Sequence, residues 1–467
     1  MKKIALIPID NRPICYDLIE DILRIDENIK LFMPKLEFLG GLDTGSNIKR
    51  IFDFIEKLDT VDYFIVSLDT IAYGGLIQSR YCENKFFEIK DRIERFREII
   101  AKKAGKILAF SSIMRISNNN INEEEKEYWS EYGKKIFDWS VKTHKLHQNI
   151  ITDIPEIILN DYIRTRKRNF DINKIYLEWA QEGFFNTLIF SKDDCSEYGL
   201  NAKEAEELSN LINEKNIQSA FIKTGADEIP LALISRALND EEKVRIKPIF
   251  TEENSINLIS KYEDVTVKNC VLGQIELANC ILDIEKPDLT LFVNNFKDEQ
   301  GDLVLGKKIN SLEKEISFPA GAYFVADINN ANGADVKFVE NIFKLAGLKN
   351  FYGYAGYNTS ANTLGCAILA AVTKFKAQKN KTYNENAFKK LQLTRFLDDW
   401  AYQAISRKKV RETKTDFLTE LKSEEDTLNK NARTIQEFLD FGFDFDFKEI
   451  EYSLPWNRSF EIRVKQK

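Results

Sequence analysis

The chain has 467 residues, more than one hydrophobic core usually serves, so two or three domains are expected. Apolar residues make up 43% and charged residues 30%, which is the composition of an ordinary globular protein and excludes a disordered one. The net charge of -7 gives no general attraction to nucleic acid or to an anionic membrane, so neither is expected as a partner.

The first apolar run, residues 4–9, is too short for the core of a signal peptide and is followed by a charge at Asp10. No apolar run approaches the ~18 residues that a membrane span needs. The six cysteines are scattered without a CxxC pair, and His144 and His147 are the two histidines. We therefore expect a cytoplasmic protein with reduced thiols, whose chemistry depends on carboxylates or on oxygen-ligated hard metal ions.

Apolar runs alternate with helical patterns through the first half of the chain. They predict strands at residues 4–9, 29–34, 62–68, 107–113, 187–191 and 219–223. They predict helices at residues 47–58, 85–103, 123–145, 155–182, from about 202, and at 229–238. Such alternation indicates a parallel sheet, and the carboxyl ends of its strands form the crevice where ligands bind.

The second half is predicted to hold a smaller α/β unit and a helical tail. A strand at residues 246–250 and a short helix at 253–261 precede strands at 289–293, 322–326 and 351–354 and a buried helix around 366–372. From about residue 377 the sequence is charged and helical, and alternating phenylalanines at 441–447 predict one strand of a closing hairpin.

The predicted fold is α/β with mostly parallel strands. The predicted domains are residues 1–260, as a doubly wound sheet or a barrel, residues 261–376, as a second α/β unit, and residues 377–467, as a helical region with a short hairpin. Site residues from the two α/β units are expected to meet at the strand ends, in a cleft between the units.

Acidic residues follow many of the predicted strands. They are Asp10, Asp69, Asp193, Asp194, Asp227 with Glu228, and Asp327. Acid-base catalysis at a glycosidic bond needs two carboxyl groups in different environments. Asp194 and Glu228 are therefore predicted as the acid and the base or nucleophile, with Asp193 and Asp227 orienting them. The alternative is that each pair only caps the helix that follows.

Further polar residues near the strand ends are predicted to bind substrate. Asparagines at two strand exits, beside Tyr354 and Tyr357, suit the hydroxyl groups and apolar faces of sugars. Equally, asparagine and glycine are typical of turns with positive φ. The full predicted substrate-binding set is Asp10, Arg12, Asp69, Arg80, Arg115, Asp327, Asn332, Asn358 and Asn362.

Four other patterns favour structural interpretations. Cys195 is expected to be a packed thiol rather than a nucleophile, and His144 with His147 a surface helix end rather than a metal site. The basic run at residues 164–169 is expected to be a solvated helix face rather than an anion site. The glycine pairs at 40–41 and 74–75 lack the spacing of a nucleotide-binding motif.

Several motifs together resemble a bacterial family of about this length that is known as a conserved domain of unknown function. They include Pro8-Ile9-Asp10-Asn11-Arg12-Pro13, Ser67-Leu68-Asp69, Tyr73-Gly74-Gly75-Leu76, Gly225-Ala226-Asp227-Glu228, Asn332-Gly333-Ala334-Asp335 and Pro455-Trp456-Asn457-Arg458. The resemblance runs from the first strand to the Trp456 tail and implies one integrated architecture. It carries no established activity. One departure is Tyr357, where the family pattern has tryptophan.

The hypothesis from the sequence is a carboxylate-dependent hydrolase acting on a glycoside or a similar polar small molecule, without a cofactor. One alternative uses the same acids to hold Mg²⁺ or Mn²⁺. Another is a non-catalytic, two-lobed protein that binds a sugar or metabolite.

Overall fold

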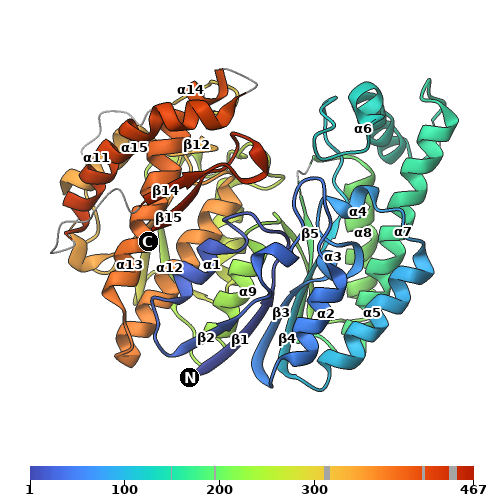
Figure 1. Ribbon diagram of the computed structural model, residues 1–467, viewed down its shortest axis with the longest axis horizontal. Coiled ribbons are helices and arrows are strands. Elements are labelled where there is room, and N and C mark those ends of the chain that lie inside the picture. Colours follow the sequence, from blue (N-terminus) through green and yellow to red (C-terminus); the bar gives the residue numbers. More distant parts are fainter. Residues whose placement is uncertain are drawn as a thin grey trace. The chain divides into compact units, whose positions relative to one another are not determined.

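A computed structural model describes residues 1–148, 150–193, 196–309, 316–345, 347–412, 416–440 and 450–466 (Figure 1). The chain divides into two compact units. Unit 1 comprises Met1–Asn11 and Lys30–Pro230, and unit 2 comprises Arg12–Ile29 and Leu231–Lys467.

Unit 1 is built on a six-stranded parallel sheet with the strand order β2-β1-β3-β4-β5-β6 (Figure 1). Its strands are β1 (Lys2–Ile7), β2 (Ile29–Phe32), β3 (Val61–Ser67), β4 (Ala104–Ile113), β5 (Thr187–Lys192) and β6 (Ala220–Thr224). The central strands are rich in isoleucine, leucine and phenylalanine because both of their faces are buried. Since β2 and β6 occupy its edges, the sheet is open and is not a barrel.

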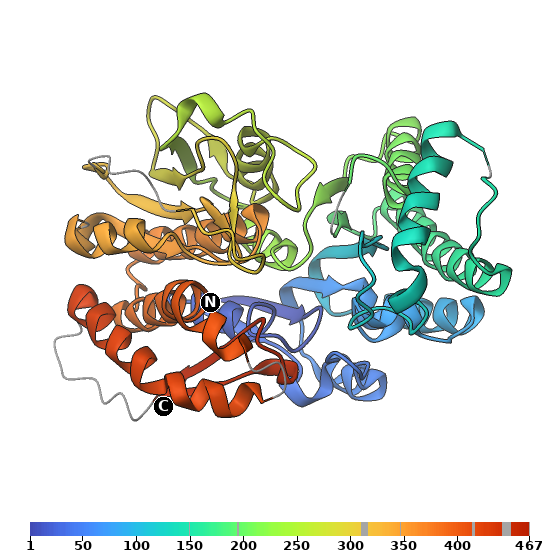
Figure 2. The ribbon, with the colours of Figure 1, turned by 90° about the horizontal axis from the view of Figure 1, so that it is seen from above.

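Helices connect successive strands of this sheet. They are α2 (Ile48–Lys57), α3 (Leu68–Tyr73), α4 (Gln78–Tyr81), α5 (Phe86–Ile100), α6 (Trp129–Leu146), α7 (Glu156–Gln181) and α8 (Leu200–Glu214), with the 3-10 turn η1 (Leu36–Phe38). The chain moves in one direction along the sheet from β3 to β6, so right-handed crossovers place α5, α7 and α8 on one face. In agreement, α5 packs on α2 and α7, and α7 packs on α8 (Figure 2).

Unit 2 contains a five-stranded parallel sheet with the order β13-β11-β9-β7-β8. Its strands are β7 (Arg245–Phe250), β8 (Ile281–Leu282), β9 (Leu289–Asn294), β11 (Tyr323–Asp327) and β13 (Phe351–Ala355). Its helices are α9 (Ile229–Leu238), α10 (Val267–Leu277), α11 (Val336–Leu345) and α12 (Ser360–Asn380). Counted in chain order this is 2-1-3-4-5, the order in which the first five strands of unit 1 are also wound, so both units are doubly wound sheets.

The C-terminal region of unit 2 is helical and ends in an antiparallel hairpin. It consists of α13 (Glu385–Arg395), the π-helix η4 (Phe396–Ser406), α14 (Arg407–Glu412), α15 (Phe417–Leu439), β14 (Ile450–Ser453), η6 (Pro455–Asn457) and β15 (Arg463–Gln466). Short elements within unit 2 are η2 (Glu253–Ser255), β10 (Gly301–Asp302), β12 (Asn330–Ala331) and η3 (Leu348–Asn350). The N-terminal helix α1 (Asp17–Leu23) belongs to this unit and packs against α12 and α13 (Figure 1).

The predicted fold class is confirmed, including the parallel sheets and the helical C-terminal region with its hairpin. The helix predicted at 253–261 is wrong. A 3-10 turn ends at Ser255, and Ile259 then forms an antiparallel bridge with Thr266, which uses backbone groups that a helix would need. The predicted strand at 441–447 lies outside the described residues. Over the ranges given above, every helix is too short or too polar to cross a membrane.

Candidate functional site

Asp69 lies where β3 ends, in the first turn of α3. Ser67 caps this helix, since its side chain accepts a hydrogen bond from Thr70 N at 3.2 Å. The Asp69 carboxylate is buried, and its two oxygens accept hydrogen bonds from Ser112 N at 2.8 Å and Ser112 Oγ at 3.0 Å. Ser112 belongs to the neighbouring strand β4, so the carboxylate joins two adjacent strand ends.

The environment of Asp69 makes its proton exchangeable near neutral pH. Burial raises the pKa of Asp69 to about 7, and the hydrogen bonds from Ser112 and the charge of Arg80 offset only part of this effect. A carboxyl group that titrates near the working pH is suited to general acid-base catalysis.

The same raised pKa makes the stability of the protein depend on pH. Between the unfolded value of 3.8 and about 7, the folded state holds a proton on Asp69 that the unfolded state has lost. Asp69 therefore lowers the free energy of unfolding by about 1.4 kcal/mol per pH unit as pH rises through this window, and adds no slope above it. Urea unfolding at several pH values between 4.5 and 8 should show a flatter profile for Asp69→Asn than for the wild type. Parallel profiles would contradict the raised pKa.

A cluster of charges lies beside Asp69 at the carboxyl ends of β3, β4 and β5. This rim cluster consists of Arg80, Arg115, Glu124, Glu125 and Asp193. Arg80 lies 3.3 Å from Glu124, 3.5 Å from Glu125 and 3.2 Å from Asp193. Arg115 lies 2.9, 3.1 and 3.8 Å from the same three carboxylates. Three carboxylates thus share two guanidinium groups, and the side chain of Arg80 is only 2% exposed while that of Asp193 is 19% exposed.

Part of the basic run of α7 holds the backbone around Arg80. The prediction that this run is a solvated helix face is therefore wrong for two of its four basic residues, Arg166 and Arg168. Arg168 donates to the carbonyl oxygens of Ser79, Cys82 and Asn84, which hold the segment around α4. Asn169 Nδ2 donates to Ser79 O at 2.8 Å. These carbonyl groups flank Arg80 in the chain, so their hydrogen bonds fix its backbone.

The run divides because a helix turns by about 100° per residue, so neighbouring residues face different ways. Arg164 and Lys167 point to solvent, with side chains 79% and 72% exposed. Arg166 is buried, pairs with Glu204 and donates to Met114 O at 2.8 Å.

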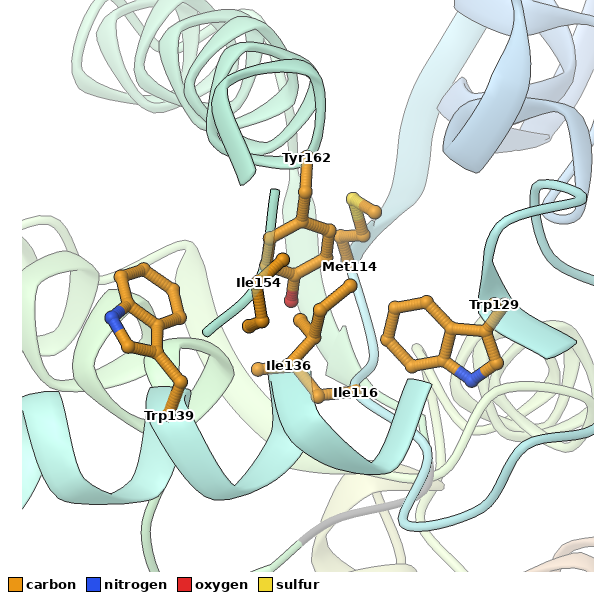
Figure 3. Packing of buried hydrophobic residues seen from close by; sticks show 7 residues of the cluster. All are labelled: Met114, Ile116, Trp129, Ile136, Trp139, Ile154 and Tyr162. Atoms are coloured by element: carbon orange, nitrogen blue, oxygen red, sulfur yellow. The ribbon is translucent and has the colours of Figure 1, made fainter. Parts of the chain in front are cut away.

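The segment that carries Glu124 and Glu125 is anchored at both ends by an apolar cluster. In Figure 3, side chains from the exit of β4, from α6 and from α7 point toward one another. The cluster comprises Met114, Ile116, Trp129, Ile136, Trp139, Ile154 and Tyr162. Ile116 lies before the glutamates in the chain and Trp129 lies after them, and both are buried. The glutamates therefore stand on a loop whose ends are fixed in a hydrophobic core.

Asp10 lies on the loop after β1, next to the turn that carries Asp69. Thr70 Oγ1 donates to Pro8 O at 2.7 Å and to Ile9 O at 3.2 Å, which ties this loop to α3. In the strand order of unit 1, the gap between the exits of β1 and β3 is the topological switch point, where doubly wound sheets bind ligands. Asp10 is buried there.

The acid pair after β6 folds back on its own turn. Glu228 is fully buried, and its Oε2 accepts a hydrogen bond from Ala226 N at 3.2 Å. Gly225 has φ of 105°, and a Cβ at this position would lie 1.6 Å from Glu228 Oε1, so only glycine fits beneath the carboxylate. Asp227 is also buried. Asp194 lies outside the described residues, so its predicted pairing with Glu228 stays a prediction.

The remaining predicted residues lie in unit 2. Asp327 is fully buried and accepts hydrogen bonds from Asn294 Nδ2 at 2.9 Å, Tyr354 OH at 3.1 Å and Asp335 N at 2.7 Å. Burial, followed by the charge of Asp335, raises the pKa of Asp327 to about 7. The guanidinium of Arg12 lies 5.2 Å from the ring centroid of Trp456.

The asparagines of unit 2 are engaged within the protein. Asn332 and Asn358 both have positive φ, and Asn332 N donates to Asn358 O at 2.7 Å. Asn332 Nδ2 donates to Asp302 Oδ1, and Asn362 Nδ2 donates to Thr359 Oγ1. These contacts agree with the turn interpretation, and a role in substrate binding stays a prediction.

Comparison with known proteins places the chain in a family. A family model described as "Protein of unknown function (DUF4127)" matches residues 4–465, nearly the whole chain. The chain belongs to the DUF4127 family. No curated protein matches it.

In this DUF4127 protein the histidines do not form a metal site with other residues that the structure describes. The prediction that His144 lies on the surface is wrong, because its side chain is buried. Its Nδ1 accepts a hydrogen bond from Gly199 N, and its Nε2 lies 3.2 Å from Glu206. Within the described ranges, no group of three or more histidine, cysteine, aspartate or glutamate side chains could hold a metal ion. The predicted role of Cys195 falls on a residue outside those ranges.

Sequence reasoning missed Glu124 and Glu125. A helix was predicted from Glu123, which would have made these glutamates an ordinary acidic first turn. In the DUF4127 chain, α6 instead begins at Trp129. The available signal was the placement of consecutive glutamates shortly after Arg115, which was itself predicted to lie at the exit of a strand.

Proposed function

We propose that this protein is a carboxylate-dependent hydrolase that acts on a glycoside or a similar polar substrate, with its reacting groups at the rim of unit 1. The observation that carries the proposal is the contrast between two carboxyl groups near Arg80. Asp69 is buried with a pKa of about 7, whereas Asp193 is partly exposed and paired with two arginines. Glycosidases separate their acid and base by such differences in environment.

In the proposed reaction, protonated Asp69 donates its proton to the leaving oxygen as the glycosidic C–O bond breaks. The Asp193 carboxylate then either removes a proton from the attacking water or attacks the sugar carbon itself and is later released by water. Arg80 lies 3.2 Å from Asp193 and would orient that carboxylate, while its charge opposes the rise in the pKa of Asp69. Asp194 with Glu228 remains the alternative acid-base pair.

The test is hydrolysis of a panel of 4-nitrophenyl glycosides by the wild type, Asp69→Asn and Asp193→Asn. Each variant should lose about a hundredfold in kcat while remaining folded, with a cooperative melting transition. Glu98→Gln removes an exposed carboxylate on α5 and should keep full activity. Absence of any glycoside hydrolysis by the wild type, or full activity in both variants, would refute the proposal.

A second candidate is a non-catalytic protein that binds a sugar or metabolite at the same rim. The pairing of all three rim carboxylates with arginines favours it, because such fixed polar groups are also what a binding site needs. Tight binding without turnover, with an affinity that survives Asp69→Asn, would support this candidate over the hydrolase.

A further inference from the structure

A large groove in unit 1 opens beside the rim cluster. Its volume is about 1610 Å³, whereas pockets for single small molecules are typically about 300–1,000 Å³. The groove is lined by residues that follow Arg80 in the chain, by the loop that carries Glu125, and by the first turns of α7. Glu125 is shared, since it lines the groove and also pairs with Arg80 and Arg115. A chain molecule held in the groove would therefore reach the rim cluster.

The charge of the groove is strongly negative. Seven of its lining residues are aspartate or glutamate and four are lysine or arginine. Three of the four cations are already used: Lys126 and Arg164 pair with Asp161, and Arg168 donates to backbone carbonyls.

Five of the seven carboxylates have no ion-pair partner within the described part of the chain. They are Asp43, Glu83, Glu123, Glu127 and Glu156, and all five side chains are exposed in the groove. The fourth cation that lines the groove is Lys85. Several like charges around one groove repel one another, and a cationic ligand relieves this repulsion while an anionic ligand adds to it.

Aromatic side chains lie among these acids. Tyr81, Phe86 and Tyr128 line the groove, and each is partly exposed. Aromatic faces pack against the apolar faces of sugar rings, and carboxylates accept hydrogen bonds from hydroxyl and ammonium groups. The combination suits a chain of sugar rings that carries positive charge.

We propose that the groove binds an oligosaccharide with free amino groups, such as a glucosamine oligomer, and positions one end of it at the rim cluster. The proposal names the substrate class of the proposed hydrolase and rests on that function for turnover, but binding can be measured without it. A neutral N-acetylated chain of equal length would have the same hydroxyl groups and ring faces without the charge. A uronic acid chain would carry the opposite charge.

The experiment compares the binding of hexamers of glucosamine, N-acetylglucosamine and galacturonic acid to the full chain by isothermal titration calorimetry. The glucosamine hexamer should bind about tenfold or more tightly than the N-acetylated hexamer at low salt, and this advantage should shrink as salt is raised. The galacturonic acid hexamer should bind most weakly.

Two matched triple variants locate the effect. Glu123→Gln, Glu127→Gln and Glu156→Gln together remove three groove carboxylates and should abolish the preference for the glucosamine hexamer. Glu98→Gln, Glu178→Gln and Glu214→Gln remove the same charge from exposed positions elsewhere in unit 1 and should keep it. Melting temperatures of both variants confirm that they are folded.

Equal or tighter binding of the neutral or acidic hexamer, absence of binding, or equal loss in both triple variants would overturn the proposal. If the glucosamine hexamer binds with the expected preference but no reducing ends are released, the groove assignment stands and the proposed hydrolase fails.

Discussion

Replacing Arg166 with methionine should lower the free energy of unfolding by about 3–5 kcal/mol, because it removes one partner of a buried ion pair. The Arg166 side chain is only 2% exposed. Its guanidinium makes a bidentate contact with Glu204, at 2.8 and 2.6 Å, and donates to Met114 O and Tyr162 OH. Methionine fills a similar volume but leaves these acceptors without a donor.

The measurement is urea unfolding at pH 7, with Arg164→Met as the control. Arg164 lies two residues earlier in the same basic run, but its side chain is 79% exposed and it makes one ion pair with Asp161. Its replacement should change stability by less than about 0.5 kcal/mol. Lysine at position 166 should not restore stability, since it cannot form the bidentate contact.

A double variant separates the ion pair from simple packing. Burial raises the pKa of Glu204 even though Arg166 opposes this, and without Arg166 this largely buried side chain, 16% exposed, would lose its cation. Arg166→Met combined with Glu204→Leu should therefore recover part of the lost stability. If Arg166→Met and Arg164→Met destabilise equally, or if the double variant is weaker than Arg166→Met, the buried pair does not have the role described here.

Replacing Arg80 with methionine should lower stability by about 3 kcal/mol and abolish any activity of the rim. Arg80 is as deeply buried as Arg166, and its loss would leave three carboxylates to share Arg115. Repulsion among Glu124, Glu125 and Asp193 would then distort the loop that carries them. Urea unfolding measures the first effect, and glycoside hydrolysis or ligand binding measures the second.

The control for Arg80 is Arg95→Met, on the exposed surface of α5. The Arg95 side chain is 61% exposed and pairs with Glu56, so its loss should cost less than about 0.5 kcal/mol. Arg80→Met with Glu125→Met should regain stability without regaining activity, because the charge balance improves while the orienting guanidinium is still missing. Recovery of activity in this double variant would show that Arg80 is only structural.

The strands of both sheets could be predicted because buried parallel strands are nearly continuous apolar runs, as in the segments at Thr187–Lys192 and Leu289–Asn294. The exit residues Asp69, Arg80, Arg115 and Asp193 could be predicted for a related reason, since strand ends of a parallel sheet meet at one edge. What the pattern could not supply was the pairing between these residues, which depends on distances across the sheet.

Other features needed information that is not local in the sequence. Glu124 and Glu125 lie on a loop, where no periodicity indicates which way a side chain points. Every residue of the basic run of α7 is polar, so the sequence pattern does not show which side chains face inward. Arg166 and Arg168 face inward because their guanidinium groups bind partners there. The winding of β7 beside β9 likewise depends on pairing between distant segments, because strands and helices alternate across this region without a break.

The membership of α1 in unit 2 has a consequence for how the protein is made. Residues 12–29 leave the ribosome early, but the helices on which α1 packs, α12 and α13, are synthesised more than 300 residues later. The apolar side of α1, formed by Leu18, Ile19, Ile22 and Leu23, is buried in the folded protein. Domains generally fold as units and from the N-terminus during synthesis. In this chain unit 2 is instead completed only after residues 360–395 have been made, although its first helix is synthesised before most of unit 1.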